Sequence, residues 1–236
     1  MKVSAENVKK ELALHASPAR AKILRGFFKT GKGDYGAGDL FLGISVPTQR
    51  EVAEKYSDIP LRDIQILLRS AVHEHRLVAL LILVDRYGCS DTMEKERILR
   101  FYLKNHMHIN NWDLVDLSAP HIVGRHLLDR QKRAIYAFAN SNHLWKKRIA
   151  IVSTLTFIRH NRFEDTFRLA EILMNDKHDL IHKAVGWMLR EAGKRDVQKE
   201  ELFLKGYYKK MPRTMLRYAI ERFPEKKRKS YLEGRV

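Results

Sequence analysis

The chain of 236 residues carries 45 lysines and arginines against 28 aspartates and glutamates, a formal net charge of +17. It is long enough to bury a sizeable core, and its 12 glycines and 6 prolines are few enough for regular structure to dominate. A single cysteine, Cys89, excludes an internal disulfide and a cysteine-based zinc site, and is typical of a reducing compartment.

The charge surplus also indicates the kind of partner. Self-repulsion of this size is most easily understood if the partner is a polyanion, with nucleic acid first and an anionic membrane surface second. A merely soluble basic surface is the alternative. The N-terminal stretch MKVSAENVKKELALHASPARAK lacks the apolar run of a signal peptide, and the longest apolar run, LVALLILV at 77–84, is too short to cross a bilayer. We therefore expect a cytoplasmic protein with no membrane partner, in which 77–84 is a buried helical segment.

The stretch KTGKGDYGAGDLFLGISVPTQR at 29–50 breaks the helical pattern with five glycines. Between Gly31 and Gly36 it has the G-x-G-x-x-G spacing, which binds a dinucleotide only between a strand and a helix. A basic amphipathic segment, PARAKILRGFF, precedes it instead, so we expect no nucleotide cofactor. A mobile loop that carries Lys32 and Tyr35 toward a partner is the favoured interpretation.

Apolar residues recur at helical spacing almost everywhere else. The segments 144–160 and 180–194 each carry one apolar stripe, and strand-like alternation is scarce. We predict roughly a dozen helices in helix pairs, an all-α arrangement. Short breaks separate them at 57–60, 87–91, 140–143 and 174–179.

A weak repeat runs through the helices. Arg76, Trp112, Arg148 and Ala184 lie 36 residues apart (112 − 76, 148 − 112, 184 − 148), close to the length of a two-helix solenoid unit. Such units stack into a curved α-solenoid with one concave face, and a basic concave face would suit a DNA duplex. No linker is long enough to divide the chain, so we predict a single domain over 1–236.

The stretch NNWDLVDLSAPHIVG at 110–124 places two acids beside a tryptophan. Either asparagine can cap a helix that starts near Trp112, and Trp112 and Asp116 then share a face. Asp113 falls near the helix N-terminus, where the dipole favours a negative charge. Asp116 has no such structural role; it is either a surface acid in an ion pair or a functional carboxylate.

Two further segments carry residues of interest. Arg148 stands in WKKRIAIV, and Trp187 stands in KAVGWMLRE with Lys183 one turn earlier and Arg190 near the same face. Alone, Trp187 indicates core packing and Arg148 a solvated or paired charge. The 36-residue phase would instead bring Trp112, Arg148 and the 183–187 turn to equivalent positions on one surface.

The sequence contains no pattern typical of a metal site or of a catalytic nucleophile. The pairs in HEH at 73–75 and HMH at 106–108 are two residues apart and point to different faces of a helix, whereas zinc needs converging ligands. No Ser-His-Asp ordering or nucleophile elbow is present. We expect no metal and no other cofactor.

Five segments together resemble the AlkD family of DNA alkylation repair glycosylases in order and spacing, over nearly the whole chain. They are FLGISVPTQR (41–50), NNWDLVDLSAPHIVG (110–124), LWKKRIAIVS (144–153), KAVGWMLREAGK (183–194) and RTMLRYAIERFP (213–224). The resemblance implies a solenoid of HEAT-like helical-hairpin repeats. It also implies base excision repair of duplex DNA, in which cationic N3- and N7-alkylpurines are released without flipping the base into a deep pocket.

The resemblance assigns roles to individual residues. Asp116 is implied as the catalytic carboxylate, Trp112 and Trp187 as aromatic residues on the lesion-strand backbone, and Arg148 as a phosphate contact. Phe27 falls where the family often has an aromatic residue, and a phenylalanine there lacks a hydroxyl for a hydrogen bond. Thr156 stands where the family often has a basic residue.

The charge and the resemblance also lead to expectations about partners. The candidates for phosphate binding, beside Arg148, are Lys183, Arg190, Arg213 and Arg217. We expect a monomer with no obligate protein partner that binds duplex DNA containing alkylated purines and associates with the bacterial nucleoid when bound. Two alternatives stay open: a non-catalytic relative that binds branched or distorted DNA, and a helical-repeat scaffold for an acidic protein.

Overall fold

The computed structural model describes residues 4–236, so only the first three residues of the predicted domain 1–236 lie outside it. Within that range regular structure is helical, and the one β feature is an isolated parallel bridge between Leu40 and Val72. The predicted all-α, helical-repeat fold is confirmed. The chain divides into two compact units, unit 1 up to Ile122 and unit 2 from Val123.

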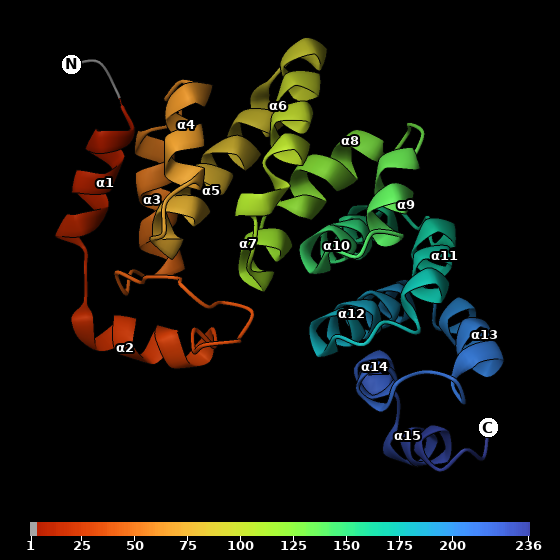
Figure 1. The fold of residues 1–236 in the computed structure, drawn as a ribbon. Helices are drawn as coiled ribbons and strands as arrows, with labels where there is room; N and C mark the ends of the chain where they lie inside the picture. The colour runs from red at the N-terminus through yellow and green to blue at the C-terminus, as the bar shows by residue number, and fades with distance from the viewer. Residues whose placement is uncertain (1–3) are drawn as a thin grey trace. The chain divides into compact units, whose positions relative to one another are not determined.

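Unit 1 is built around one buried helix (Figure 1). Its elements are α1 (Ala5–Leu14), α2 (Pro18–Phe27), α3 (Val46–Lys55), α4 (Leu61–Leu68), α5 (His73–Cys89), α6 (Thr92–Lys104), the 3₁₀ turn His106–His108 and α7 (Trp112–Asp116). Helices α1, α3, α4, α6 and α7 all contact α5. Every residue of α5 from His73 to Leu83 is buried, which confirms the helical segment predicted at 77–84.

Helix α2 differs from the other helices of unit 1. Ser17 caps its N-terminus and Pro18 occupies the first turn, where a missing N–H costs nothing. Only Ala21 is buried on it, while Ile23 and Phe27 are 69% and 61% exposed. Figure 1 draws α2 across the ends of the neighbouring helices of unit 1, so it forms a cover over one end of that bundle.

Unit 2 is a succession of helix pairs. Its elements are α8 (Arg125–Leu127), α9 (Arg133–Ala139), α10 (Leu144–Arg159), α11 (Glu164–Leu173), α12 (Asp179–Arg195), α13 (Val197–Tyr207), α14 (Arg213–Ala219), the 3₁₀ turn Ile220–Arg222 and α15 (Glu225–Leu232). A π-helical turn, Pro120–Gly124, spans the junction of the two units in the sequence.

In unit 2 the second helices of successive pairs, α10, α12 and α14, pack against one another in a row. Helix α10 packs on α9 and α12, and α12 packs in turn on α14. This row confirms the helices predicted over 144–160 and 180–194, and the break predicted at 140–143 falls between elements. The break predicted at 174–179 is one residue too long, because α12 begins at Asp179, and the break predicted at 87–91 is partly wrong, because α5 continues to Cys89. Stacked pairs of this kind bury a continuous core that no single pair could bury.

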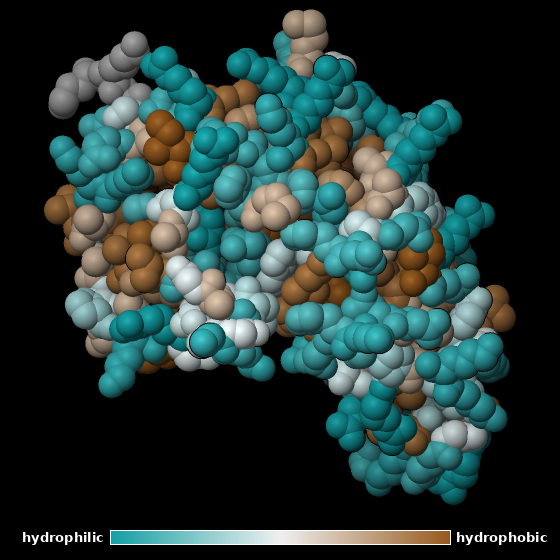
Figure 2. Space-filling view, viewed as in Figure 1, coloured by the Kyte–Doolittle hydropathy of each residue, from teal (hydrophilic) through white to brown (hydrophobic). Residues whose placement is uncertain are grey.

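No described helix combines the length and the apolar character that a membrane span would need. Figure 2 shows a face on which hydrophilic side chains predominate and hydrophobic side chains are scattered.

The close approach of α12 and α14 depends on Gly186. A Cβ at this position would lie 2.5 Å from the Cβ of Tyr218 and would also clash with the backbone oxygen of Met215. One neighbour is a backbone atom and the other is a Cβ fixed to the backbone, so neither can move unless α14 moves. The glycine thus sets the spacing of these two helices.

We therefore expect Gly186→Ala to lower the free energy of unfolding by about 1–3 kcal/mol, because overpacking forces the helices apart. The matched control is Gly206→Ala on α13, where nothing lies within 4 Å of the added Cβ. It is expected to keep or raise stability, since alanine favours a helix over glycine by about 0.5–1 kcal/mol. Urea denaturation of both variants measures the difference, and equal stabilities would contradict this account of the α12–α14 contact.

A buried carboxylate lies beneath α12. Glu200 of α13 is buried against Gly193, and its Oε1 has no hydrogen-bond partner among the described residues. Burial, reinforced by the nearby charge of Glu201, raises the pKa of Glu200 to about 8, although Lys227 and Arg190 oppose the shift. The folded protein therefore holds this proton at a pH at which the unfolded chain has released it.

This linkage has a definite sign. Because the folded pKa exceeds the unfolded value, the contribution of Glu200 to stability falls as the pH rises from about 4.5 to about 8. Glu200→Gln should remove that fall, so the variant becomes more stable relative to wild type toward alkaline pH. Denaturation midpoints across this window test it, with Glu225→Gln at an exposed position as control; parallel profiles for all three proteins would refute it.

Candidate functional site

Helix α7 carries the two acids and the tryptophan of the opening motif. Asn111 caps it, accepting a hydrogen bond from the backbone N–H of Trp112 at 2.8 Å, as predicted. Asp113 is buried, and its Oδ1 accepts the N–H of Leu114 at 2.8 Å in the first turn. Trp112 and Asp116 are half-buried, stand one turn apart on α7 as predicted, and line a cavity that Asp113 lines as well.

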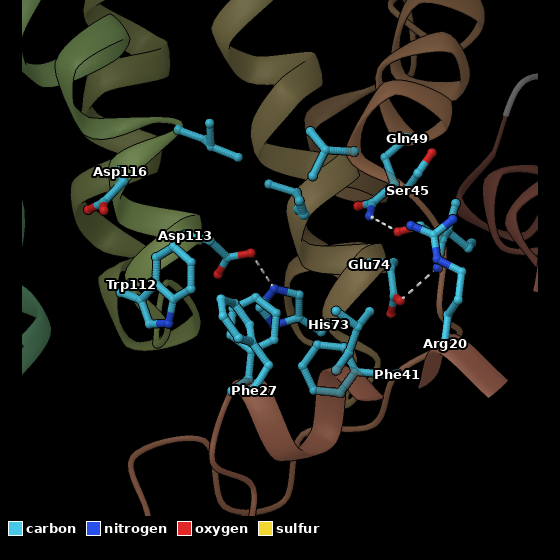
Figure 3. Close-up of a pocket in the computed structure, with 16 residues that line it drawn as sticks. Arg20, Phe27, Phe41, Ser45, Gln49, His73, Glu74, Trp112, Asp113 and Asp116 are labelled. Carbon is cyan, nitrogen blue, oxygen red and sulfur yellow. Dashed lines mark hydrogen bonds and ion pairs between the residues drawn. The ribbon is translucent and has the colours of Figure 1, made fainter. Parts of the chain in front are cut away.

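A buried chain of charged and polar groups holds α7 in place (Figure 3). The imidazole Nε2 of His73 lies 2.7 Å from Oδ2 of Asp113, and Nδ1 lies 3.4 Å from Oδ2 of Asp39. The guanidinium of Arg76 lies 2.7 Å from the same Asp39 oxygen, and Asn111 donates to it at 3.4 Å. His73 thereby connects α5 with α7 and with the end of the glycine-rich loop.

The charges along this chain reinforce one another. Burial lowers the pKa of His73, but the Asp113 carboxylate and the hydrogen bonds to Asp113 and Asp39 outweigh it, and the net pKa is raised above 6.5. Burial raises the pKa of Asp39, but the hydrogen bond from His73 and the charge of Arg76 bring it below 3.8. The imidazolium is therefore favoured between two carboxylates.

The second half of the glycine-rich loop is anchored to the start of α5. Leu40 makes two backbone hydrogen bonds there, from its N–H to the oxygen of Ala71 at 3.0 Å and to its oxygen from the N–H of His73 at 2.8 Å. The carboxylate of Glu74 accepts the backbone N–H groups of Leu42, Gly43 and Ile44 at 3.0, 2.7 and 3.3 Å. The stretch predicted at 29–50 is non-helical only up to residue 45, because α3 begins at Val46, and Lys32 is exposed in its first half. That the loop is mobile and carries Lys32 and Tyr35 toward a partner stays a prediction.

Gly43 makes this anchorage possible. Its φ is +84°, in the left-handed region, and a Cβ would lie 2.6 Å from the backbone N of Ala21 on α2. Only glycine meets both conditions without strain.

Aromatic rings surround the start of α7. Phe28 stacks on Trp112 with ring centroids 5.1 Å apart, and Phe41 stacks on His73 at 4.7 Å. Phe27 meets the edges of Phe28 and Trp112 at 5.1 and 5.7 Å. The predicted site residues Phe27 and Trp112 are therefore in contact, although 85 positions of sequence separate them (112 − 27).

These side chains line a cavity of about 340 Å³ that lies within unit 1. Its aromatic walls come from α2, the loop and α7, and its carboxylates are Glu74, Asp113 and Asp116. Figure 3 shows Asp116 on the α7 side and Arg20, Ser45 and Gln49 on the opposite side. This cavity forms where α2 and the loop lie over the helix ends of unit 1, and release of the base without flipping into a deep pocket stays a prediction.

Arg148, the implied phosphate contact, lies on α10 of unit 2. It is buried, 5% exposed, and it donates from a guanidinium nitrogen to the backbone oxygen of Leu180 at 2.6 Å. This bond ties α10 to the start of α12. Thr156, two turns later on the same helix, is also buried, and it lies next to Gly124. The phosphate contact of Arg148 stays a prediction.

The residues predicted on α12 are half-buried and held by acids. The indole N–H of Trp187 donates to Glu191 at 3.2 Å, and Lys183 pairs with Asp179 at 2.7 Å. Arg190 pairs with Glu221 and approaches Glu191 at 3.7 Å.

The two arginines of α14 are exposed. Arg213 donates to the backbone oxygen of Leu232 at 2.6 Å, and Arg217 is exposed. Lys183, Arg190, Arg213 and Arg217 all belong to unit 2, as does Trp187.

The sequence interpretation missed the residues that support α7. The sequence suggests a role for His73 only as a possible metal ligand, and it predicts no role for Asp39, Glu74 or Gln49. The available signal was a histidine and a glutamate together at the start of the most apolar helix, where buried charges need partners. Within residues 4–236, no cluster of three or more His, Cys, Asp or Glu has the arrangement of a metal site.

The buried contacts of His73 lead to a prediction about the pH dependence of stability. The pKa of His73 is higher in the folded protein than in the unfolded chain, so the charged imidazole stabilises the fold fully at low pH. This stabilisation is lost as the pH rises through the folded pKa. His73→Gln should therefore cost about 3 kcal/mol of unfolding free energy on the acid side of neutrality, and less at alkaline pH. Chemical denaturation over a pH series measures this.

Asp113→Asn is the matched partner variant. It should flatten the pH dependence of the unfolding free energy in the same way. The double variant should lose less unfolding free energy than the two single variants added together, because both changes remove the same interaction. Additive losses would show that the two side chains act separately.

Comparisons with known proteins agree with this architecture. The family model described as DNA alkylation repair enzyme matches residues 8–223. A sequence search among curated proteins found no match. A solved structure described as a predicted DNA alkylation repair enzyme from Enterococcus faecalis superposes with a TM-score of 0.71, covering 89% of this chain and 98% of that chain at 16% identity. That likeness shows the fold, and the match of the family model across both units shows that the chain belongs to the DNA alkylation repair enzyme family.

Proposed function

We propose that the protein is a DNA N-glycosylase of the cytoplasm that hydrolyses the bond between deoxyribose and a cationic N3- or N7-alkylpurine in duplex DNA. The observation that carries the proposal is the half-buried carboxylate of Asp116, which shares an aromatic-lined cavity with Trp112 in a chain of the DNA alkylation repair enzyme family.

The chemistry needs only one carboxylate. An alkyl group on N3 or N7 leaves the base positively charged, so the base departs with the electrons of the glycosidic bond and becomes neutral without a general acid. This differs from sugar hydrolysis by two carboxylates. Positive charge then develops on C1′ of the deoxyribose, and the oxygen of water bonds to that carbon while its proton passes to solvent.

Asp116 suits both parts of this step. An ionised carboxylate stabilises the growing positive charge and orients the attacking water. Trp112 lies on the same face, and an indole ring can contact the C–H groups of deoxyribose and attract its cationic character. The fixed position of α7, held by Asn111 and Asp113, favours a preorganised carboxylate.

The net charge of +17 supports duplex DNA as the partner. Arg20 of α2 is exposed and lines the cavity of unit 1, and the exposed Arg213 and Arg217 of α14 lie on unit 2. In this proposal, Arg148, Lys183, Arg190, Arg213 and Arg217 bind phosphates, and Trp187 contacts the strand that carries the lesion. Because phosphate contacts release counterions, the affinity for DNA should fall steeply with salt.

Asp116→Asn tests the catalytic role. It should slow the release of 7-methylguanine and 3-methyladenine from methylated duplex DNA at least about a hundredfold, the usual cost of losing one preorganised electrostatic group. Duplex affinity should be unchanged or slightly higher, because a negative charge near phosphates is removed. Chromatography of the released bases and a fluorescence binding titration give the two values.

The matched control is Asp58→Asn, the same change at an exposed position of unit 1 outside the cavity lining. It should release both bases at the wild-type rate. Normal excision by Asp116→Asn would refute the assignment of the carboxylate. Tight duplex binding by the wild-type protein without any base release would instead favour a non-catalytic DNA-binding protein.

A further inference from the structure

The C-terminal end of α7 is held by two buried hydroxyl groups. Tyr102 of α6 and Ser118, two residues beyond the end of α7, are both fully buried in unit 1. The Tyr102 hydroxyl lies 2.9 Å from Oγ of Ser118, and that Oγ donates to the backbone oxygen of Leu114 at 2.5 Å. The bond between His73 and Asp113 holds the first turn of the helix, so α7 is fixed at both ends.

The direction of these two hydrogen bonds follows from the number of hydrogens. A serine hydroxyl carries one hydrogen, and a backbone oxygen can only accept. Because Ser118 gives its hydrogen to Leu114, the bond between the two hydroxyls needs the hydrogen of Tyr102. Tyr102 is therefore the donor at the head of a chain that ends on the backbone of α7, and each bond in such a chain polarises the next.

Ser118 also determines where α7 ends. In a helix that continued, the backbone N–H of Ser118 would bind the oxygen of Leu114, four residues earlier. That N–H binds Val115 at 3.1 Å instead, and the serine side chain takes its place on Leu114. Asp116 is consequently the last residue of α7, at a position where an unsupported helix would fray.

Tyr102 stays neutral in these surroundings. Burial raises the pKa of Tyr102 above its usual value, the hydrogen bond to Ser118 lowers it, and the charge of Asp116 raises it further. The phenol therefore keeps the hydrogen that the chain of bonds requires. The effect of Asp116 on Tyr102 also places the carboxylate within electrostatic reach of the hydroxyl.

We propose that Tyr102 is a positioning residue for Asp116, because its bond to Ser118 fixes the end of α7 on which Asp116 stands. The part that Asp116 plays in catalysis rests on the proposed function, whereas the anchorage of the helix end rests on the hydrogen bonds. Tyr102 is fully buried and lies outside the cavity lining, so it acts through Ser118 and the backbone. The position of a reacting group matters because a misplacement of about 1 Å can slow a reaction about a hundredfold.

Tyr102→Phe tests this role, because it removes the hydroxyl and keeps the ring. With the protein in excess of methylated duplex DNA, base release should slow at least about tenfold, while duplex affinity keeps its wild-type value. Loss of affinity is not expected, since the hydroxyl touches neither the cavity nor the protein surface. The rates are measured at a temperature at which thermal denaturation shows every variant to be folded.

Tyr87→Phe is the matched control. Tyr87 is also buried in unit 1, but it lies about 21 Å along α5 from His73, the residue that contacts α7. Removal of its hydroxyl should leave base release at the wild-type rate. A general loss of packing in unit 1 would instead slow both variants.

Variants of Ser118 show whether Tyr102 acts through it. Ser118→Ala removes both bonds and should slow base release more than Tyr102→Phe does. Adding Tyr102→Phe to Ser118→Ala should then slow release no further, because the donor has already lost its acceptor. Losses that multiply in the double variant would show that Tyr102 acts by another route and would overturn the proposal.

Amide hydrogen exchange measures the anchorage without any activity. The backbone N–H groups of Leu117 and Ser118 close the last turn of α7. In Tyr102→Phe they should exchange at least about tenfold faster than in the wild-type protein, because the end of the helix opens more often. Tyr87→Phe should leave their exchange unchanged.

The two measurements separate this inference from the proposed function. Slower base release at unchanged affinity, together with faster exchange at the end of α7, supports the positioning role of Tyr102. Normal release by Tyr102→Phe, or an equal loss in Tyr87→Phe, overturns that role and leaves the glycosylase standing. If the wild-type protein releases no base, the proposed function fails and exchange alone decides: faster exchange in Tyr102→Phe supports the anchor, and unchanged exchange overturns it.

Discussion

The buried hydrogen bond between His73 and Asp113 is the constraint on which the site depends. A charged pair this far from water is tolerable only with good geometry and further partners, and here Asp39, Arg76 and Asn111 supply them. Because these groups come from α5, α7 and the glycine-rich loop, their pairing fixes three elements together. Trp112 and Asp116 are positioned as a consequence, although neither belongs to the chain of charges.

The sequence predicted what depends on local spacing. Apolar periodicity located α5, α10 and α12, and the asparagine before Trp112 located the start of α7. It did not predict the role of His73, whose partners lie 34 and 40 residues away and whose motif was weighed only for metal binding. The cavity was missed for the same reason, since it exists only after α2 and the loop close over the ends of other helices.

Burial divides the predicted basic residues into two groups. Arg148 is nearly inaccessible and joins α10 to α12 through the oxygen of Leu180, so in the free protein it performs a structural task. Arg213 and Arg217 are exposed on α14, where a phosphate could reach them without rearrangement. Positive charge in the sequence predicts attraction to DNA, but only the exposed part of it is available for contact.

The composition of the cavity follows from the chemistry that we propose. A base that already carries a positive charge needs no proton donor in order to leave, and a donor aimed at it would oppose its charge. Groups around such a base should instead be ring faces, carboxylates and neutral acceptors, which attract the cation in the ground state. The aromatic rings of the lining and the carboxylate of Asp116 are groups of this kind. Because the base loses its charge when the glycosidic bond breaks, such groups would hold the product less tightly than the substrate, so attraction of the lesion and release of the base are compatible at one site.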